Sequence, residues 1–222
     1  MRIRGAIFDM DGTLIDSLSF WGRLWPRIGA HFLGQPDFRP SAEVEMALRT
    51  MLLDEAIEYF RVACAIPATR EELIDFTAGD LVDFYKNIAT VKAGGRELLT
   101  ALKAAGVPMV VASATEGELL RTALGFHGLL PYFDSVLSCV DVGAGKEKPD
   151  IYLRAAEAMG LAPCEVCVFE DSLVALRTAA AAGFHTVGIF DRHTAGQDEI
   201  RAASSLAYVA EGEPLTAALP LL

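Results

Sequence analysis

The sequence has few of the features that mark secreted, membrane-spanning or nucleic-acid-binding proteins. It contains only four cysteines in 222 residues, which argues against a framework of disulfide bonds. No segment approaches the roughly 20 consecutive apolar residues that cross a bilayer, and no charged and apolar leader precedes the first strand-like segment. The net charge of −11 argues against a nucleic-acid partner, because a phosphate backbone requires a cationic face. We therefore expect a cytoplasmic protein, a monomer or a weak dimer, that binds neither nucleic acid nor membranes.

Two of the cysteines have the spacing of a metal or redox motif. Cys164 and Cys167 form a C-x-x-C pair, but Cys167 lies in an apolar run, where it is expected to be buried as a small apolar side chain. No second C-x-x-C or histidine pair completes a tetrahedral zinc site. The pair is therefore interpreted as structural.

The composition, 52% hydrophobic and 22% charged, provides ample material for a packed core. Short apolar runs predict buried strands at residues 2–8, 107–112, 135–139, 165–169 and 186–190, with an edge strand near 206–209. Helical patterns separate several of these runs, at residues 116–124, 151–159 and 173–182. Strands that alternate with helices predict an α/β fold whose parallel sheet has helices on both faces. Such a sheet binds ligands at the carboxyl ends of its strands.

One long segment interrupts this alternation. Residues 17–91 contain no evident strand and carry amphipathic helical patterns at 20–32, 42–62 and 71–88. A block of about 75 residues is too long for an ordinary crossover. It predicts a helical domain, residues 17–91, inserted into an α/β core made of residues 1–16 and 92–222.

The first predicted strand ends in a pair of carboxylates. Alternation along a strand places Asp9 and Asp11 on the same side, and Gly12 allows a sharp turn after them. Two crowded carboxylates repel each other unless a cation or a proton lies between them, and Mg²⁺ suits a site built from oxygen ligands. A pair of capping aspartates at a strand-to-helix turn is the alternative interpretation.

Polar residues also follow the other predicted strands. The second strand ends in Ser113-Ala114-Thr115, Lys146 lies in the loop after the third, and Glu170-Asp171 ends the fourth. Any one of these residues could be a helix cap or a solvated side chain. Because parallel strands end at one edge of a sheet, however, their joint occurrence predicts a single site.

This series of motifs resembles that of the haloacid dehalogenase superfamily of phosphotransferases. The resemblance rests on D-x-D-G-T followed by D-S in the segment 9–17, on Ser113, on Lys146 and on the E-D-S segment 170–172. These motifs occur in the family's order over almost the whole chain. The resemblance is to the branch with a helical cap between its first two motifs. It implies a Rossmann-like, doubly wound parallel sheet with an inserted α-helical cap domain, and a Mg²⁺-dependent phosphatase that acts on a small phosphorylated metabolite such as a sugar phosphate.

The resemblance assigns a nucleophile and a set of metal ligands. Asp9 would attack the phosphoryl group and form an aspartyl-phosphate, while the Asp11 side chain would protonate the leaving alcohol and then activate water. Mg²⁺ would be bound by Asp9, the backbone carbonyl of Asp11 and Asp171, with Glu170 bound to it directly or through water.

Further residues are assigned to the substrate. Ser113 and the Ala114 amide would hydrogen-bond phosphoryl oxygens at a helix N-terminus, and Thr13 would help to orient Asp11. Arg49, in the helical domain, is a candidate for binding a second polar part of the substrate; a surface arginine that packs its stem on apolar neighbours is the alternative.

The lysine of the site is a choice between two residues. The family's lysine often stands three residues before a proline, as Lys146 does before Pro149, whereas Lys148 directly precedes that proline. We predict that Lys146 balances the carboxylates, with Lys148 as the alternative.

The reaction is narrowed by three positions. Dehalogenases of the superfamily lack the second aspartate of the first motif, so Asp11 favours phosphate chemistry. Mutases of the β-phosphoglucomutase type usually lack a threonine after D-G and have a histidine early in the cap, where this chain has Thr13 and Trp21. These differences favour a phosphatase, and a sugar-phosphate mutase remains the alternative.

Overall fold

The apolar runs of the sequence form a six-stranded parallel sheet in the computed structural model, which describes residues 3–48, 51 and 53–221. The strand order is β5-β4-β1-β6-β7-β8, and each neighbouring pair is parallel. The strands are β1 (Gly5–Phe8), β4 (Met109–Ser113), β5 (Ser135–Ser138), β6 (Val166–Glu170), β7 (His185–Ile189) and β8 (Ala207–Val209). The predicted α/β fold with a parallel sheet is therefore confirmed.

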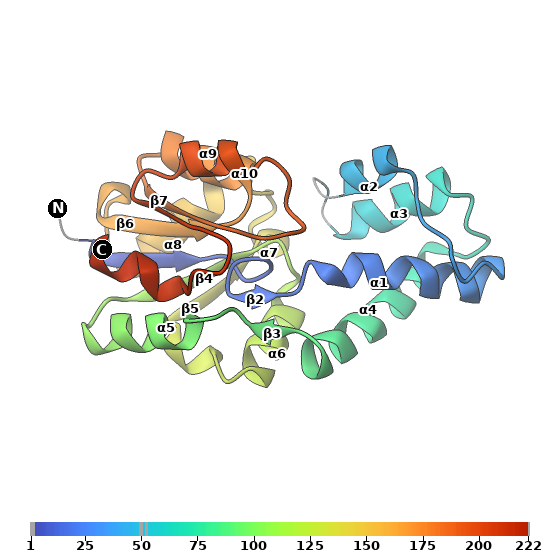
Figure 1. Ribbon diagram of the computed structural model, residues 1–222, viewed down its shortest axis with the longest axis horizontal. Helices are drawn as coiled ribbons and strands as arrows, with labels where there is room; N and C mark the ends of the chain where they lie inside the picture. Colours follow the sequence, from blue (N-terminus) through green and yellow to red (C-terminus); the bar gives the residue numbers. More distant parts are fainter. Residues whose placement is uncertain (1–2, 49–50, 52, 222) are drawn as a thin grey trace. The chain divides into compact units, whose positions relative to one another are not determined.

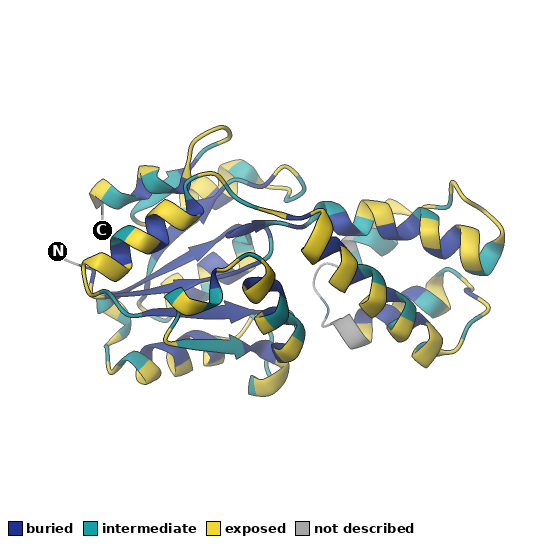
Figure 2. Ribbon diagram, turned by 90° about the horizontal axis from the view of Figure 1, so that it is seen from below, coloured by how far each residue is buried: buried dark blue, intermediate teal, exposed yellow. Residues whose placement is uncertain are grey.

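Helices cover both faces of this sheet, with α5 and α6 on one side and α9 and α10 on the other (Figure 1). Helix α8 packs against β1, β4 and β5. These helices are α5 (Gly95–Ala104), α6 (Gly117–Phe126), α8 (Asp150–Met159), α9 (Leu173–Ala181) and α10 (Gln197–Ala203). Buried residues fill β1, β4 and β6 and most of β7, whereas the edge strands β5 and β8 are largely of intermediate exposure; the helices are exposed along their outer sides (Figure 2). This pattern explains why the strands read as continuous apolar runs.

The pairing of the central strand β1 with β6 determines which residues at the carboxyl ends of these two strands are neighbours. Phe8 is paired with Phe169 on β6, and the two rings stack with their centroids 4.3 Å apart. The backbone N–H of Asp9 then donates to the carbonyl of Phe169 at 3.0 Å. Asp9 therefore lies level with Glu170, the last residue of β6.

The chain divides into two compact units, Met1–Ser17 with Ala89–Leu222 and, separately, Leu18–Ile88. The second unit is helical. It contains α1 (Ser19–Ile28), which continues into a π-helical turn (Gly29–Leu33), and then α2 (Ala42–Leu48), α3 (Leu53–Ala63) and α4 (Arg70–Asn87). The segment 42–62, predicted as one helical pattern, thus forms two helices. The sequence did not indicate the break, because no glycine or proline lies between them.

A capping box marks the beginning of α4, and stacked aromatic rings form part of the core of the helical unit. The Thr69 hydroxyl accepts from the Glu72 backbone N–H at 3.1 Å, and the Glu72 carboxylate accepts from the Thr69 N–H at 2.8 Å, a capping box. Trp25 is 2% exposed and lies between the rings of Trp21 and Phe60, at centroid distances of 5.5 and 4.9 Å. Trp25 therefore belongs to the packed interior of this unit.

Two short strands lie where the chain passes between the units. Strand β2 (Ile15–Asp16) pairs antiparallel with β3 (Thr90–Val91). The expectation of no strand between residues 17 and 91 is wrong at β3, because a two-residue strand is too short to show any periodicity. The chain consequently leaves the α/β unit and returns to it at adjacent positions.

Among the described residues, no helix combines the length and the apolar composition needed to cross a membrane.

Candidate active site

The D-x-D-G-T segment forms a tight turn at the end of β1. Gly12 has φ of +84°, a conformation that favours glycine, and the backbone N–H groups of Leu14 and Ile15 both donate to the carbonyl of Met10 at 2.9 Å. Asp9, immediately before this turn, is 5% exposed. The turn therefore holds a buried carboxylate at the carboxyl end of the central strand.

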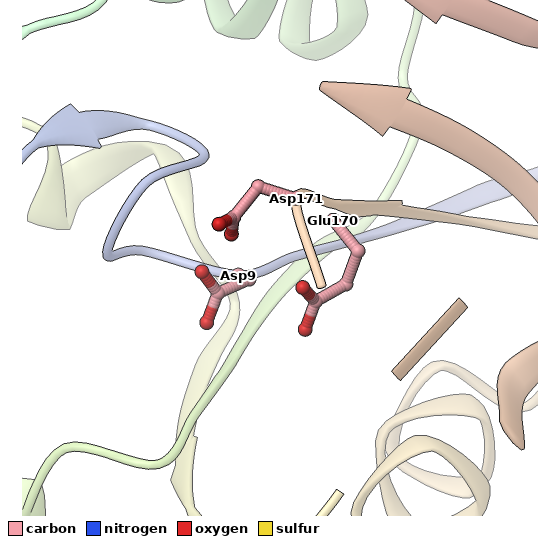
Figure 3. A group of neighbouring side chains, drawn as sticks. All are labelled: Asp9, Glu170 and Asp171. Atoms are coloured by element: carbon pink, nitrogen blue, oxygen red, sulfur yellow. The ribbon is translucent and has the colours of Figure 1, made fainter. Parts of the chain in front are cut away.

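Three carboxylates converge at this position (Figure 3). One oxygen each from Asp9, Glu170 and Asp171 lie within 4.8 Å of one another, and all three residues are buried. Carboxylate oxygens are the ligands that Mg²⁺ prefers. The donor set therefore fits a small divalent cation, as the sequence predicts.

Lys146 supplies positive charge to the cluster. Its ammonium group hydrogen-bonds to Asp9 Oδ1 at 2.5 Å and to Glu170 Oε1, and its side chain is 14% exposed. Lys148 is exposed to solvent. Of the two candidate lysines, the fold thus brings Lys146 to the carboxylates.

Burial and nearby charges shift the pKa values of the ionisable groups in the cluster. Burial, together with Glu170, Asp171 and Asp11, raises the pKa of Asp9 well above its usual value, although Lys146 opposes that rise. Burial and Glu170 raise the pKa of Asp171 to about 7. Burial lowers the pKa of Lys146, but the adjacent carboxylates Asp9 and Glu170 more than offset this effect, so its pKa is well above normal and it stays charged. One ammonium thus compensates three carboxylates only in part.

Glu170 is anchored more firmly than the sequence indicated. Its Oε2 accepts from the Ser172 backbone N–H at 3.1 Å, and its Oε1 accepts from the Tyr152 hydroxyl at 3.3 Å as well as from Lys146. Burial raises the pKa of Tyr152 well above its usual value, so the hydroxyl keeps its proton and remains a donor. Tyr152 is a contact of the site to which the sequence motifs assigned no role.

The second aspartate of the motif is held apart from the three-carboxylate cluster. Asp11 Oδ1 accepts from the Ser17 hydroxyl at 2.6 Å, and Oδ2 accepts from the Thr115 hydroxyl at 2.7 Å. Ser17 lies in the first motif and Thr115 follows the second predicted strand, but the sequence assigned neither residue a function. The Asp11 side chain therefore has hydroxyl partners from two strand ends.

Two substrate-binding predictions differ from the observed structure. Thr13, expected to orient Asp11, is fully buried and its hydroxyl donates to Asp171 Oδ1 at 3.1 Å. Helix α6 begins at Gly117, and its first amides donate to the Glu116 carboxylate, so the helix start is three residues beyond Ala114 and already capped. These differences arise from the hydrogen bond between Thr13 and Asp171 and from the Glu116 side chain that caps α6, neither of which the sequence pattern revealed.

Ser113 and Ala114 nevertheless lie at the carboxyl end of β4. Ser113 is 1% exposed and its hydroxyl accepts from the Thr115 backbone N–H at 3.1 Å, whereas Ala114 is exposed. Arg49, the remaining candidate, lies outside the described residues.

The sequence is similar to those of known hydrolases, and the fold is similar to that of a solved structure. A family model for haloacid dehalogenase-like hydrolases matches residues 3–183. The validoxylamine A 7'-phosphate phosphatase of Streptomyces hygroscopicus subsp. limoneus is 30% identical over 202 residues, covering 86% of this chain and 87% of that protein. The fructose-1-phosphate phosphatase of Escherichia coli K12 is 27% identical over 192 residues, covering 85% and 97%. A crystal structure from Thermotoga maritima, described as a candidate β-phosphoglucomutase, has a TM-score of 0.81 at 24% identity and covers 99% and 100% of the two chains.

The chain belongs to the haloacid dehalogenase-like hydrolase family, and it is an enzyme of the hydrolase class. Its parallel sheet is the fold expected for that family.

Proposed function

We propose that this hydrolase is a Mg²⁺-dependent phosphatase that acts on a small phosphorylated metabolite of the sugar-phosphate class. The observation that carries the proposal is the charge of the buried cluster. Three carboxylates, Asp9, Glu170 and Asp171, lie within 4.8 Å of one another, and Lys146 contributes a single positive charge to them. With all four groups ionised, the residual charge of −2 matches a divalent cation, and the buried cluster has a strong electrostatic reason to bind one.

In the first chemical step, a carboxylate oxygen of Asp9 attacks the phosphorus atom of the substrate. The phosphorus–oxygen bond to the alcohol breaks as the bond to Asp9 forms, which yields an aspartyl-phosphate. Asp11 transfers a proton to the departing alcohol oxygen. Lys146 holds Asp9 in place and offsets its charge, so that the carboxylate can approach an anionic phosphoryl group.

In the second step, Asp11 takes a proton from a water molecule whose oxygen attacks the phosphorus atom. The bond between Asp9 and the phosphorus breaks, inorganic phosphate leaves, and Asp9 is regenerated. The hydroxyl groups of Ser17 and Thr115 hold the Asp11 side chain for both proton transfers. Ser113 and the Ala114 amide are the proposed donors to the phosphoryl oxygens.

Asp9, the backbone carbonyl of Asp11, Asp171 and, directly or through water, Glu170 would hold the Mg²⁺. When bound, the cation supplies charge neutralisation for the phosphoryl oxygens.

The substrate class is supported by the relatives, since two similar proteins are named as phosphatases of validoxylamine A 7'-phosphate and of fructose 1-phosphate. A sugar-phosphate mutase is the second candidate, favoured by the high structural similarity to a chain described as a candidate β-phosphoglucomutase. Thr13 and Trp21, which occupy positions where that type of mutase usually differs, support the phosphatase.

Hydrolysis of p-nitrophenyl phosphate and of a sugar-phosphate panel, with MgCl₂ or with EDTA, tests this proposal. We expect Mg²⁺-dependent phosphate release that Asp9→Asn lowers by at least about 10³-fold, because no other group replaces the nucleophile. An inactive wild type across the panel, or an active Asp9→Asn variant, would contradict it. Conversion of β-glucose 1-phosphate into glucose 6-phosphate rather than free phosphate would favour the mutase.

A further inference from the structure

The loop between β7 and α10 brings a second threonine to the carboxylate of Asp171. The Thr194 hydroxyl donates to Asp171 Oδ2 at 2.7 Å, and the Thr13 hydroxyl donates to Oδ1 at 3.1 Å. Each oxygen of this buried carboxylate therefore accepts one hydroxyl hydrogen bond. Since a carboxylate oxygen has about two acceptor positions, both oxygens keep a position for another partner.

Thr194 is itself held from both sides of its backbone. Its N–H donates to the Asp191 carbonyl at 3.1 Å, and its own carbonyl accepts from Gln197 Nε2 at 2.7 Å. Gln197 also donates to the Asp191 carbonyl at 2.8 Å, and its Oε1 accepts from the Tyr208 hydroxyl on β8 at 2.7 Å. A continuous series of hydrogen bonds thus connects the edge strand β8 to Asp171.

The loop carries an acidic residue near Asp171, but that residue has its own counter-ion. Asp191 is 2% exposed and its carboxylate lies 2.9 Å from Lys92 Nζ, while its other oxygen accepts from the His193 backbone N–H at 2.8 Å. Lys92 also donates to the Phe190 carbonyl at 2.7 Å. The loop therefore approaches Asp171 with its buried charge paired, and Thr194 presents a neutral donor to the carboxylate.

We propose that Thr194 is a positioning residue that fixes the orientation of Asp171 toward the divalent cation. The proposal rests on the metal site of the proposed function. Hydrogen bonds to a ligating carboxylate set its orientation, and their loss typically weakens metal affinity by about 10- to 100-fold. Thr13 belongs to the first motif, whereas Thr194 lies at a different strand end, so the two hydroxyls constrain the carboxylate from separate segments of the chain.

Calorimetric titration of the metal-free protein with MgCl₂ tests this inference directly. We expect Thr194→Val to weaken Mg²⁺ binding by about 10-fold or more, and Thr194→Ser, which keeps the hydroxyl, to stay within about twofold of the wild type. Because Thr194 acts through a metal ligand, the kcat of Thr194→Val is expected to recover at saturating Mg²⁺.

Thr186→Val is the matched control, because Thr186 is also buried and its hydroxyl donates to the Ala203 carbonyl at 2.9 Å, away from Asp171. This variant is expected to lower the melting temperature without changing Mg²⁺ affinity. If Thr194→Val does not fold, Gln197→Met provides a second test, since it removes the bond that holds the Thr194 carbonyl and is expected to weaken Mg²⁺ binding several-fold.

Unchanged Mg²⁺ affinity in Thr194→Val, or in Gln197→Met if that variant replaces it, would overturn the inference while leaving the proposed function intact. Equal weakening in Thr194→Val and Thr194→Ser would also overturn it, because the effect would then not depend on the hydroxyl. A wild type that releases no phosphate and binds no Mg²⁺ would instead overturn the proposed function, and this inference with it.

Discussion

The hydroxyl of Thr115 donates to Oδ2 of Asp11 at 2.7 Å, although 104 positions separate the two residues in the sequence. The bond connects the end of β4 to the turn after β1. Because Asp11 is the proposed proton donor and acceptor, Thr115 holds the group on which both chemical steps depend. Ser138, whose hydroxyl donates to the Thr115 carbonyl at 2.8 Å, in turn fixes the Thr115 backbone from β5.

Replacing Thr115 by valine is therefore expected to lower kcat by about 10-fold or more, since a hydrogen bond to a charged group contributes roughly 1.5–3 kcal/mol. Thr115→Ser should keep most of the activity. Steady-state kinetics measure the effect, with Thr100→Val as the control, because the Thr100 hydroxyl lies on α5 and contacts the Arg96 carbonyl and Tyr132. An unchanged kcat in Thr115→Val would remove Thr115 from the proposed machinery.

Lys146 and Lys148 should differ sharply in their contributions. Lys146→Met leaves Asp9 and Glu170 buried without their ammonium partner, and breaking a buried ion pair typically costs about 3–5 kcal/mol. We expect a loss of activity of at least about 100-fold and a lower free energy of unfolding, measured by urea denaturation in EDTA. Lys148→Met, at an exposed position, should leave both quantities unchanged; similar losses in the two variants would contradict the assignment.

The metal-free protein is expected to become less stable as the pH rises from about 4 to about 7. The pKa of Asp171 is raised to about 7 in the folded state from an ordinary value of 3.8, so the folded state holds more protons than the unfolded state between these values. The contribution of protonated Asp171 to the free energy of unfolding is complete below pH 4 and is lost as Asp171 ionises. The raised pKa of Asp9 changes the free energy of unfolding in the same direction.

Urea denaturation in EDTA across this pH range measures the effect, and Asp171→Asn should flatten the dependence. Addition of MgCl₂ at pH 7.5 should restore stability to the wild type, since a ligand that binds only the folded state stabilises it. A stability that rises steadily from pH 4 to 7 would contradict the assigned direction.

The thiols should react in an order set by burial. Cys164 is exposed, whereas Cys139 and Cys167 are buried, and burial raises the pKa of Cys139 to about 11. Since the thiolate is the reactive form, a disulfide reagent such as DTNB at pH 8 is expected to modify Cys164 first. Cys164→Ser should abolish the fast phase. Fast modification of Cys167 would show that the C-x-x-C pair is more accessible than its burial indicates.

Much of the candidate site was predictable because parallel strands end at one edge of a sheet. That rule alone places Asp9, Lys146, Glu170 and Asp171 together, and the spacing to Pro149 favoured the lysine that reaches Asp9 in the structure. The short apolar runs likewise identified the strands, since strands buried on both faces have little room for polar residues.

Hydroxyl groups were harder to assign than carboxylates. Thr194 follows a predicted strand, as the other site residues do, but a threonine in a loop is common and its partner depends on the loop's conformation. That conformation is set by Gln197 and Tyr208, whose contacts no local pattern reveals. The same reason explains Thr13, whose partner is Asp171, 158 positions away.

The pairing of β2 with β3 has a consequence for how the chain tolerates changes in length. Asp16 is directly opposite Thr90, so the ends of the helical insertion are held next to each other by the ladder of the α/β unit. A segment inserted there can grow, shrink or be exchanged without shifting the register of the six-stranded sheet. The two-residue ribbon thus makes the helical unit a replaceable module, while the strand ends that carry the carboxylates remain fixed.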